Sequence, residues 1–425
     1  MAKKKTKKQA ENQVRKAAKK HPVLVTIAIL LIVAIAGCCI LHRKGVIHVP
    51  FLDKLIPQET NENTDVDATG GEFTSEDIEK LIPQETNENT DVDATGGEFT
   101  SEDIETIKNG DLSIHFMVLG NKYSGDSTLI KVGDTEVLID AGSRVNSAPT
   151  ITSYINRFCT DGVLEYVIAT HADRDHIAAF PKIFENYECE TIIDFPRTNA
   201  TSDTYNNYVT ARTAEIEAGA THYTALECYK ETNGAQKSYA LGNGITMNFL
   251  YQEFYETDTN DENDYSVCML LTQTTTAGEI NYLFTGDLEK DGESSLVDNN
   301  TLPKCKLFKA GHHGSKTSST DKLLSVIQPD IVCVCCCAGS DEYKANPENT
   351  FPTQAFVDRV ANYTSNVYVT TLSTDTETGY EPMNGNIVVL SRDGVVTVRC
   401  SNHATVLKDT DWFKNNRTCP SAWSD

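Results

Sequence analysis

Positive charge is scarce in this chain of 425 residues. Lys and Arg number 37 against 61 Asp and Glu, which leaves a formal net charge of −24 at pH 7. Residues 106–425 alone carry 24 basic and 43 acidic side chains. Proteins that bind nucleic acid strongly usually present a basic face to its phosphates. Activity on nucleic acid would therefore need a local basic patch. The candidates for that patch are Lys304, Lys306, Lys309 and Lys316.

The cysteines form neither a regular disulfide framework nor a zinc module. Eleven of the 13 lie beyond the N-terminal apolar segment, which is an odd number, and no Cys-x-x-Cys pair has a partner pair at zinc-ribbon spacing. Four fall within the apolar stretch 331–339, which predicts a buried strand in which cysteine acts as a small hydrophobic residue. A disulfide between Cys400 and Cys419 stays open.

The sequence has no multi-span apolar region, and its one long hydrophobic run covers residues 23–41. Nineteen such residues are about enough to span a bilayer. Residues 1–22 hold nine basic residues against one acidic residue, so the positive-inside bias predicts a cytoplasmic tail, a single transmembrane anchor, and an external C-terminal part. The alternative is a lipoprotein signal that anchors the chain through Cys38, because small residues precede it. Both interpretations predict a protein held at the outer face of the cell membrane.

Residues 42–105 are predicted to form an acidic linker. Within it, residues 54–79 and 80–105 are identical at every one of 26 positions, and each copy holds one Lys and eight acidic residues. A segment of this composition buries too little apolar surface to offset the entropy lost on folding. We therefore expect a disordered stalk.

The segment Thr-His-Ala-Asp-Arg-Asp-His at 170–176 carries the strongest chemical signal. It follows residues 164–169, which predict a buried strand, and precedes residues 177–186, which predict a helix. The motif should therefore lie on the connecting loop.

Four side chains of this loop are of the types that bind metals. His171 and Asp173 lie two apart on an extended segment and can face one ion, while Asp175 and His176 can face a second. A polar turn whose residues only hydrogen-bond one another is the alternative interpretation.

Two later apolar segments also end in candidate ligands. Asp287 follows 281–286, where a carboxylate is placed to bridge two metals, and His312 and His313 follow 306–311. One of these histidines would complete the second metal site, and the residues leave open which one. We assign His312 to the metal and place His313 with Asp175 and Lys316 in the catalytic group.

The loop after the paired histidines predicts a phosphate cradle. Residues 314–319 lead into a predicted helix at 320–327, where Ser or Thr would cap the helix and its free N–H groups would attract an anion. Lys316 would add a positive charge.

In this order, the pieces resemble the hydrolase domain of ComEC-type competence DNA-uptake proteins, within the metallo-beta-lactamase superfamily. The resemblance covers about residues 111–400. The matching elements are Gly-Asp-Ser at 125–127, Leu-Ile-Asp-Ala-Gly at 138–142, His-Ala-Asp-Arg-Asp-His at 171–176, Asn263-x-x-Ser266, Thr-Gly-Asp at 285–287, His-His-Gly-Ser-Lys at 312–316, and Gly-Asn-Ile-Val-Val at 385–389.

The resemblance implies an α/β fold, the αββα metallo-beta-lactamase-like sandwich, as a hydrolase domain over 106–400 with a C-terminal tail at 401–425. It also implies two divalent metal ions. The carboxylate of Asp173 replaces an imidazole, which makes manganese as suitable as zinc. Relatives usually carry His before the proline where this chain has Asn346. His222 is the one candidate for the middle histidine of the superfamily, and its polar surroundings favour a surface position.

Three functions remain open from the sequence. The first is a membrane-anchored phosphodiesterase that acts on DNA, which the resemblance favours. The second is a surface hydrolase of another phosphodiester, such as teichoic acid or phosphocholine decorations, or of an ester or lactone, which the acidic composition favours. The third is an inactive binding module, which Asn346 permits. No protein partner is identifiable from the sequence.

Overall fold

The computed structural model describes residues 97–98, 107, 112–340, 342, 346–392 and 394–424. All of them fall in one unit of the chain, Leu81–Asp425. The predicted tail at 1–22, the anchor at 23–41 with Cys38, and the first repeat at 54–79 lie outside the described residues. Within the described part, no helix is both long and apolar enough to cross a bilayer.

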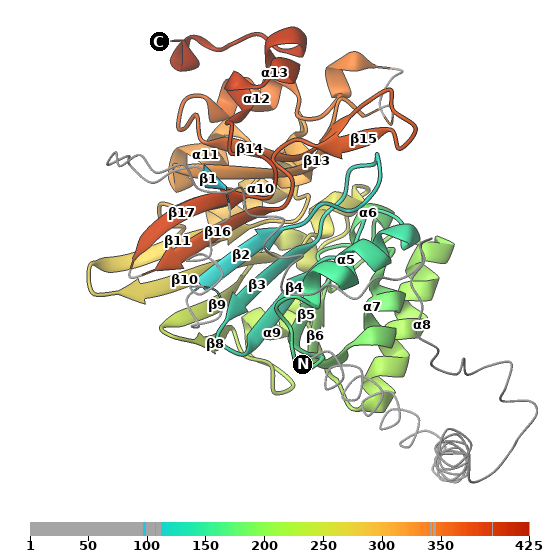
Figure 1. Ribbon diagram of the computed structural model, residues 1–425. Coiled ribbons are helices and arrows are strands. Elements are labelled where there is room, and N and C mark those ends of the chain that lie inside the picture. The colour runs from blue at the N-terminus through green and yellow to red at the C-terminus, as the bar shows by residue number, and fades with distance from the viewer. Residues whose placement is uncertain are drawn as a thin grey trace, which may run out of the picture. The chain divides into compact units, whose positions relative to one another are not determined.

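One large mixed sheet is built mainly from the first half of the described chain (Figure 1). Its neighbours are antiparallel from β17 to β4 and parallel from β4 to β7. In spatial order its nine described strands are β1 (Gly97–Glu98), β17 (Val395–Cys400), β16 (Ile387–Arg392), β2 (Leu112–Phe116), β3 (Thr128–Val132), β4 (Thr135–Ile139), β5 (Val163–Ile168), β6 (Glu188–Asp194) and β7 (Thr221–Thr224).

A second mixed sheet comes from the later part of the chain. Its central strands β11 to β14 run parallel, and antiparallel strands flank them. In spatial order its eight described strands are β15 (Tyr380–Pro382), β14 (Val367–Ser373), β13 (Ile331–Ala338), β12 (Leu307–Lys309), β11 (Gly278–Phe284), β10 (Cys268–Thr275), β9 (Ile245–Leu250) and β8 (Ser238–Gly242).

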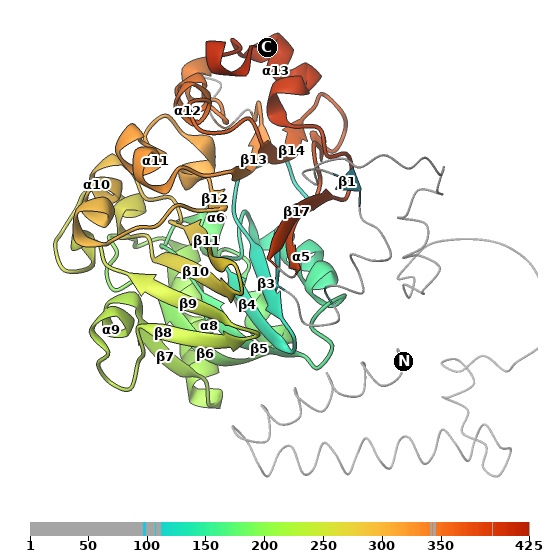
Figure 2. The ribbon, with the colours of Figure 1, turned by 90° about the vertical axis from the view of Figure 1, so that its left-hand side faces the viewer.

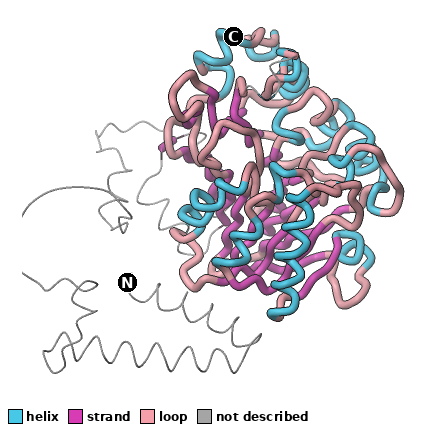
Figure 3. The backbone as a smooth tube through the Cα atoms, turned by 90° about the vertical axis from the view of Figure 1, so that its right-hand side faces the viewer, coloured by secondary structure: helices cyan, strands magenta, loops and turns pink. Residues whose placement is uncertain are grey.

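The two sheets pack face to face, and helices cover their outer faces (Figures 2 and 3). A single buried apolar cluster takes side chains from both sheets, and the rings of Phe116 on β2 and Phe284 on β11 stack across it with centroids 6.5 Å apart. A second cluster lies between the later sheet and its helices. The α-helices are α5 (Ala148–Ile155), α6 (Arg174–Ile177), α7 (Phe180–Asn186), α8 (Asp203–Ala218), α9 (Ala225–Lys230), α10 (Lys290–Asn299), α11 (Asp321–Ile327), α12 (Gln354–Val360) and α13 (Asp411–Asn416).

The fold is thus mixed α/β with two large sheets, as the sequence predicted at that level. Parallel strands place their carboxyl ends at one edge of a sheet, where ligands usually bind. The loops that leave β4, β5, β11 and β12 carry the polar motifs singled out in the sequence.

Several boundaries differ from those predicted. The helix expected at 177–186 is two helices, α6 and α7, because α6 starts directly after Asp173 within the ligand loop. Strand β1 lies inside the range assigned to the linker and pairs with β17. The tail at 401–425 contains α13, and the side chains of Phe413 and Trp423 pack into the second apolar cluster.

The cysteines of β13 are buried, as expected for small core residues. Cys400 and Cys419 are both free thiols. The disulfide that the sequence left open is therefore not formed in this structure.

Candidate metal centre

The ligand loop after β5 is held against two glycine-containing loops. Asp126 N donates to the Asp175 carbonyl at 3.0 Å, and Ala141 N donates to the His176 carbonyl at 2.7 Å. Gly142 allows this close approach, because a Cβ there would lie 1.4 Å from the Asp175 carbonyl oxygen. The Gly-Asp-Ser and Asp-Ala-Gly motifs therefore position the loop between Asp173 and His176.

Four histidines of the site are each held through Nδ1. The Nδ1 partners of His171, His176, His312 and His313 are, in that order, Thr170 Oγ1 (3.1 Å), Asp140 Oδ2 (2.8 Å), Glu289 Oε1 (2.8 Å) and the Cys335 carbonyl (2.8 Å). Such contacts fix the tautomer and leave Nε2 to bind a metal. Among the described residues, Nε2 of His171 and of His176 is buried and has no hydrogen-bond partner.

The free nitrogens converge on carboxylates from different parts of the chain. Asp287 Oδ2 lies 3.1 Å from Nε2 of His176 and 3.1 Å from Nε2 of His313. Asp175 Oδ2 lies 3.3 Å from the same His313 nitrogen. His171 Nε2 lies 3.8 Å from Asp173 Oδ2, and its ring centroid is 4.1 Å from that of His176. The residues thus form two adjoining groups, with Asp287 in the first.

The electrostatics of the site suit cations. Burial by itself would raise the pKa of Asp287, but His176, His313 and Lys309 hold it well below its usual range. Burial, and then the neighbouring Asp175, raise the pKa of Asp173 to about 6. Buried carboxylates facing unpartnered imidazole nitrogens are a donor set for divalent metals. The residues present therefore fit the two predicted ions.

The two adjacent histidines face different partners. His313 is fully buried and contacts Asp175 and Asp287. His312 is partly exposed, and its Nδ1 donates to Glu289, a carboxylate that also accepts from Thr317 at 2.7 Å. The geometry thus places His313 among the metal-facing groups, where the sequence analysis had assigned His312.

The remaining predicted residues lie outside this cluster. Lys316 is exposed, on the loop after the paired histidines. His222 on β7 is paired with Asp194 at 2.9 Å. Asn346 is exposed, and its backbone and side-chain oxygens accept hydrogen bonds from the amides of the following turn.

Three further residues of the centre were not assigned from the sequence. Asp126 and Asp140 lie in motifs that had been noted, Gly-Asp-Ser and Leu-Ile-Asp-Ala-Gly, and each motif could have pointed to its aspartate. Lys309 had been placed in a surface patch, but it is buried and contacts Asp126 and Asp287. Lys306 of the same predicted patch pairs with Asp330 at 2.8 Å. The patch as predicted does not form.

The predicted phosphate cradle is occupied by the protein itself. The buried carboxylate of Glu293 accepts from Ser319 N at 2.5 Å and from Thr320 N at 2.7 Å, at the start of α11. The guanidinium of Arg359 donates to carbonyls of the same loop, including Ser318 at 2.7 Å. An internal carboxylate thus takes the place of the anion, so the cradle prediction was wrong.

Part of the chain is similar in sequence to two known proteins. Over 254 residues, 59% of the chain, it is 27% identical to Recombination protein 2 of Haemophilus influenzae. Over 168 residues, 39% of the chain, it is 25% identical to ComE operon protein 3 of Bacillus subtilis. The matched regions span 27% and 19% of these relatives. No family model matches the chain.

Solved structures show remote likeness only. A metallo hydrolase, Igni18, from Ignicoccus hospitalis aligns with 65% of this chain and 98% of its own at 13% identity and a TM-score of 0.35. A metallo-beta-lactamase from Cronobacter sakazakii aligns with 45% of this chain and 74% of its own at 15% identity and a TM-score of 0.29. The two sequence matches confirm the resemblance to ComEC-type proteins that the motifs predicted. The similarity holds for the part of those proteins that this chain spans.

Proposed function

We propose that this chain is a metal-dependent phosphodiesterase that acts on DNA at the outer face of the cell membrane, held there by residues 23–41. The observation that carries the proposal is the set of four histidines fixed through Nδ1, with buried Nε2 atoms of His171 and His176 that have no hydrogen-bond partner among the described residues and face carboxylates. The relative named as a recombination protein supports DNA as the substrate.

The residues present divide into holding and orienting groups. Asp175, His176, His313 and Asp287 would hold one ion, and His171, Asp173 and Asp287 the other. Two divalent ions in such a site lower the pKa of a bound water and stabilise the attacking and leaving oxygens of a displacement at phosphorus. Asp140 and Glu289 orient His176 and His312, and the burial of His171, His176 and His313 keeps bulk water away from that side of the centre.

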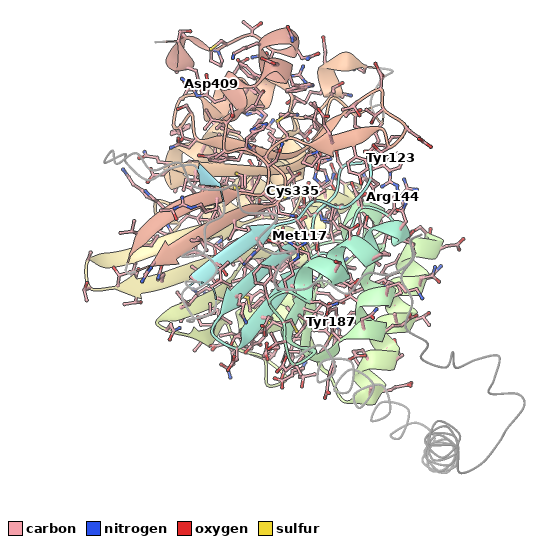
Figure 4. The ribbon with its side chains drawn as sticks, in the orientation of Figure 1. Met117, Tyr123, Arg144, Tyr187, Cys335 and Asp409 are labelled. Atoms are coloured by element: carbon pink, nitrogen blue, oxygen red, sulfur yellow. The ribbon has the colours of Figure 1, made fainter. Side chains whose placement is uncertain are left out.

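A basic side chain also lies on the loops that adjoin the centre. The guanidinium of Arg144 lies over the ring of Tyr123, 4.1 Å from its centroid (Figure 4). Tyr123 precedes Asp126 by three residues, and Arg144 follows Gly142 by two. A guanidinium stacked on an aromatic ring is suited to contacts with bases and phosphates of single-stranded nucleic acid. In this structure the Arg144 guanidinium pairs with Glu342 at 2.6 Å, so a phosphate would have to replace that carboxylate.

The test is hydrolysis by the purified full-length chain with Mn²⁺ or Zn²⁺. The substrates are an aryl phosphodiester, single-stranded DNA and double-stranded DNA. His171→Gln and Asp175→Asn should abolish cleavage of all of them, whereas His222→Gln, a matched histidine outside the centre, should retain it. Arg144→Gln should raise KM for DNA and leave the aryl diester nearly unchanged.

An acidic rim favours a second candidate. Asp261 lies close to Glu289 and Asp264, and Glu262 lies close to Asp173, beside the centre. Burial raises the pKa of Asp264 and of Asp173, and the charges of Asp261 and Glu262 add to the rise. Such a rim repels a polyanion. A smaller envelope phosphodiester, or an ester or lactone, is therefore the alternative substrate. Cleavage of the aryl diester without cleavage of DNA would support the diester. Metal binding with no hydrolysis of either would favour an ester, a lactone or a binding module.

A further inference from the structure

The proposed function gives no role to Lys309, although its side chain lies in the centre. It is the last residue of β12, and its side chain is buried. Its ammonium contacts Asp126 Oδ2, lies 3.2 Å from Asp287 Oδ1, and donates to the Gly286 carbonyl at 3.1 Å. An ammonium has three N–H donors, and three acceptors surround this one. No donor is left for a substrate.

The contacts divide the oxygens of each carboxylate. The Lys309 ammonium contacts Oδ1 of Asp287, and Oδ2 of Asp287 faces Nε2 of His176 and of His313. The ammonium also contacts Oδ2 of Asp126. The other oxygen of Asp126, Oδ1, is buried and lies 3.3 Å from His313 Nδ1, and it has no hydrogen-bond partner within the described part of the chain. One oxygen of each aspartate is thus fixed by the lysine, and the other points toward the histidines.

Asp140, the third buried carboxylate of the centre, is held without a lysine. Asp140 accepts from Thr170 N at 2.8 Å, from Thr170 Oγ1 at 2.8 Å and from His176 Nδ1 at 2.8 Å. Neutral donors and one imidazole satisfy it. Asp126 and Asp287 have no comparable set of backbone and hydroxyl donors among the contacts described, and an unpaired buried charge is costly. His313 also lies near both carboxylates, but the lysine is the contact of both whose charge is permanent.

We propose that Lys309 is a positioning residue of the metal centre, a fixed cation that keeps Asp126 and Asp287 in place and aims the free oxygen of each toward the ion-binding histidines. The inference rests on the proposed metal-dependent function. It follows that the centre keeps its form without metal, and that loss of the lysine makes the fold depend on metal ions for the missing charge.

The experiment is thermal unfolding of the full-length chain, with EDTA or with Mn²⁺, for the wild type and for Lys309→Met. We expect the variant to lower the Tm of the metal-free protein by roughly 10 °C. With Mn²⁺ the loss should be less than half as large. Lys306→Met is the matched control, since Lys306 lies three residues earlier in a surface ion pair, and it should change neither value.

A double variant separates charge from packing. In Lys309→Met, a further Asp126→Asn removes one of the two uncompensated carboxylates, so the metal-free Tm should rise again. If the single variant does not fold, a folded double variant supports the inference, and an unfolded one overturns it. Equal losses of Tm with and without Mn²⁺, or a deeper loss in the double variant, also overturn it. Metal content of the wild type, measured by mass spectrometry, tests the proposed function separately, because a wild type that binds neither Mn²⁺ nor Zn²⁺ contradicts the proposed function itself.

Discussion

His176 and Asp140 form a buried pair in which Nδ1 of the imidazole lies 2.8 Å from Oδ2 of the carboxylate. Asp140 follows β4 and His176 lies in α6, so the contact joins the ends of neighbouring strands of the first sheet. Because the carboxylate accepts from Nδ1, Nε2 of His176 is directed to Asp287.

Asp140→Asn should weaken metal binding by about 10–100-fold, because the ligand histidine loses the partner that fixes its tautomer. Titration of the purified chain with Mn²⁺ against a chelator measures the effect. Asp194→Asn is the matched control, since Asp194 is a second buried aspartate paired with a histidine, His222. Equal affinities of Asp140→Asn and the wild type would contradict the proposed role.

The adjacent residues His312 and His313 should differ in their effect on metal binding. Loss of an outer partner already costs about 10–100-fold in metal affinity, so loss of a direct ligand should cost at least as much. His313→Gln should therefore lose bound metal. His312→Gln should retain it, because His312 faces Glu289 rather than Asp287. Metal content per chain decides between them, and the reverse pattern would restore the assignment made from the sequence.

Gly142→Ala should destabilise the fold by about 3 kcal/mol or more, because the added Cβ would lie 1.4 Å from the Asp175 carbonyl oxygen and the ligand loop would have to move. Gly133→Ala is the control. Its Cβ meets nothing within 4 Å, and its positive φ of 58° should cost about 1 kcal/mol. Urea unfolding measures both, and similar losses for the two variants would be inconsistent with the packing argument.

Arg359→Met should loosen the loop from Ser315 to Ser319 and cost about 3 kcal/mol, because the guanidinium donates to four carbonyls there. Amide hydrogen exchange of the loop should accelerate. Lys322→Met, which removes surface contacts on α11, should cost less than about 1 kcal/mol. Unchanged exchange in Arg359→Met would show that the loop does not depend on this residue.

His115 gives a pH dependence away from the metal centre. Burial, and then the charge of Lys131, lower the pKa of His115 from 6.5 to about 3. The folded protein therefore keeps this imidazole neutral where the unfolded chain binds a proton, so its stabilising effect is complete above pH 6.5 and is lost as the pH falls toward 3. His115→Asn should reduce the acid slope of the unfolding free energy by about 1.4 kcal/mol per pH unit between pH 6 and 4.

Denaturant unfolding at several pH values measures that slope. The variant also loses the contact of His115 with Tyr154, so its stability should be lower at pH 8, and the slope is the quantity to compare. His403→Asn, at an exposed position, serves as the control. An unchanged slope in His115→Asn would show that this residue does not couple folding to pH.

The amino-acid sequence by itself determined the local parts of the centre. The spacing of His171, Asp173, Asp175 and His176 after an apolar segment predicted a ligand loop after a strand, and the structure has that loop after β5. The prediction worked because the strand signal and the ligand spacing both lie within one short window.

Only the tertiary structure decided which distant groups complete the centre. From its own segment Lys309 is predicted to be a surface charge. The parallel pairing of β12 with β11 and β13 instead places its side chain between Asp126 and Asp287. Glu293 lies more than twenty residues before the loop it caps, so the sequence around Lys316 showed free N–H groups where the fold supplies a carboxylate. A local sequence pattern shows which side chains and backbone groups a segment contains. The partner of a buried charge depends on packing between strands that are far apart in the chain.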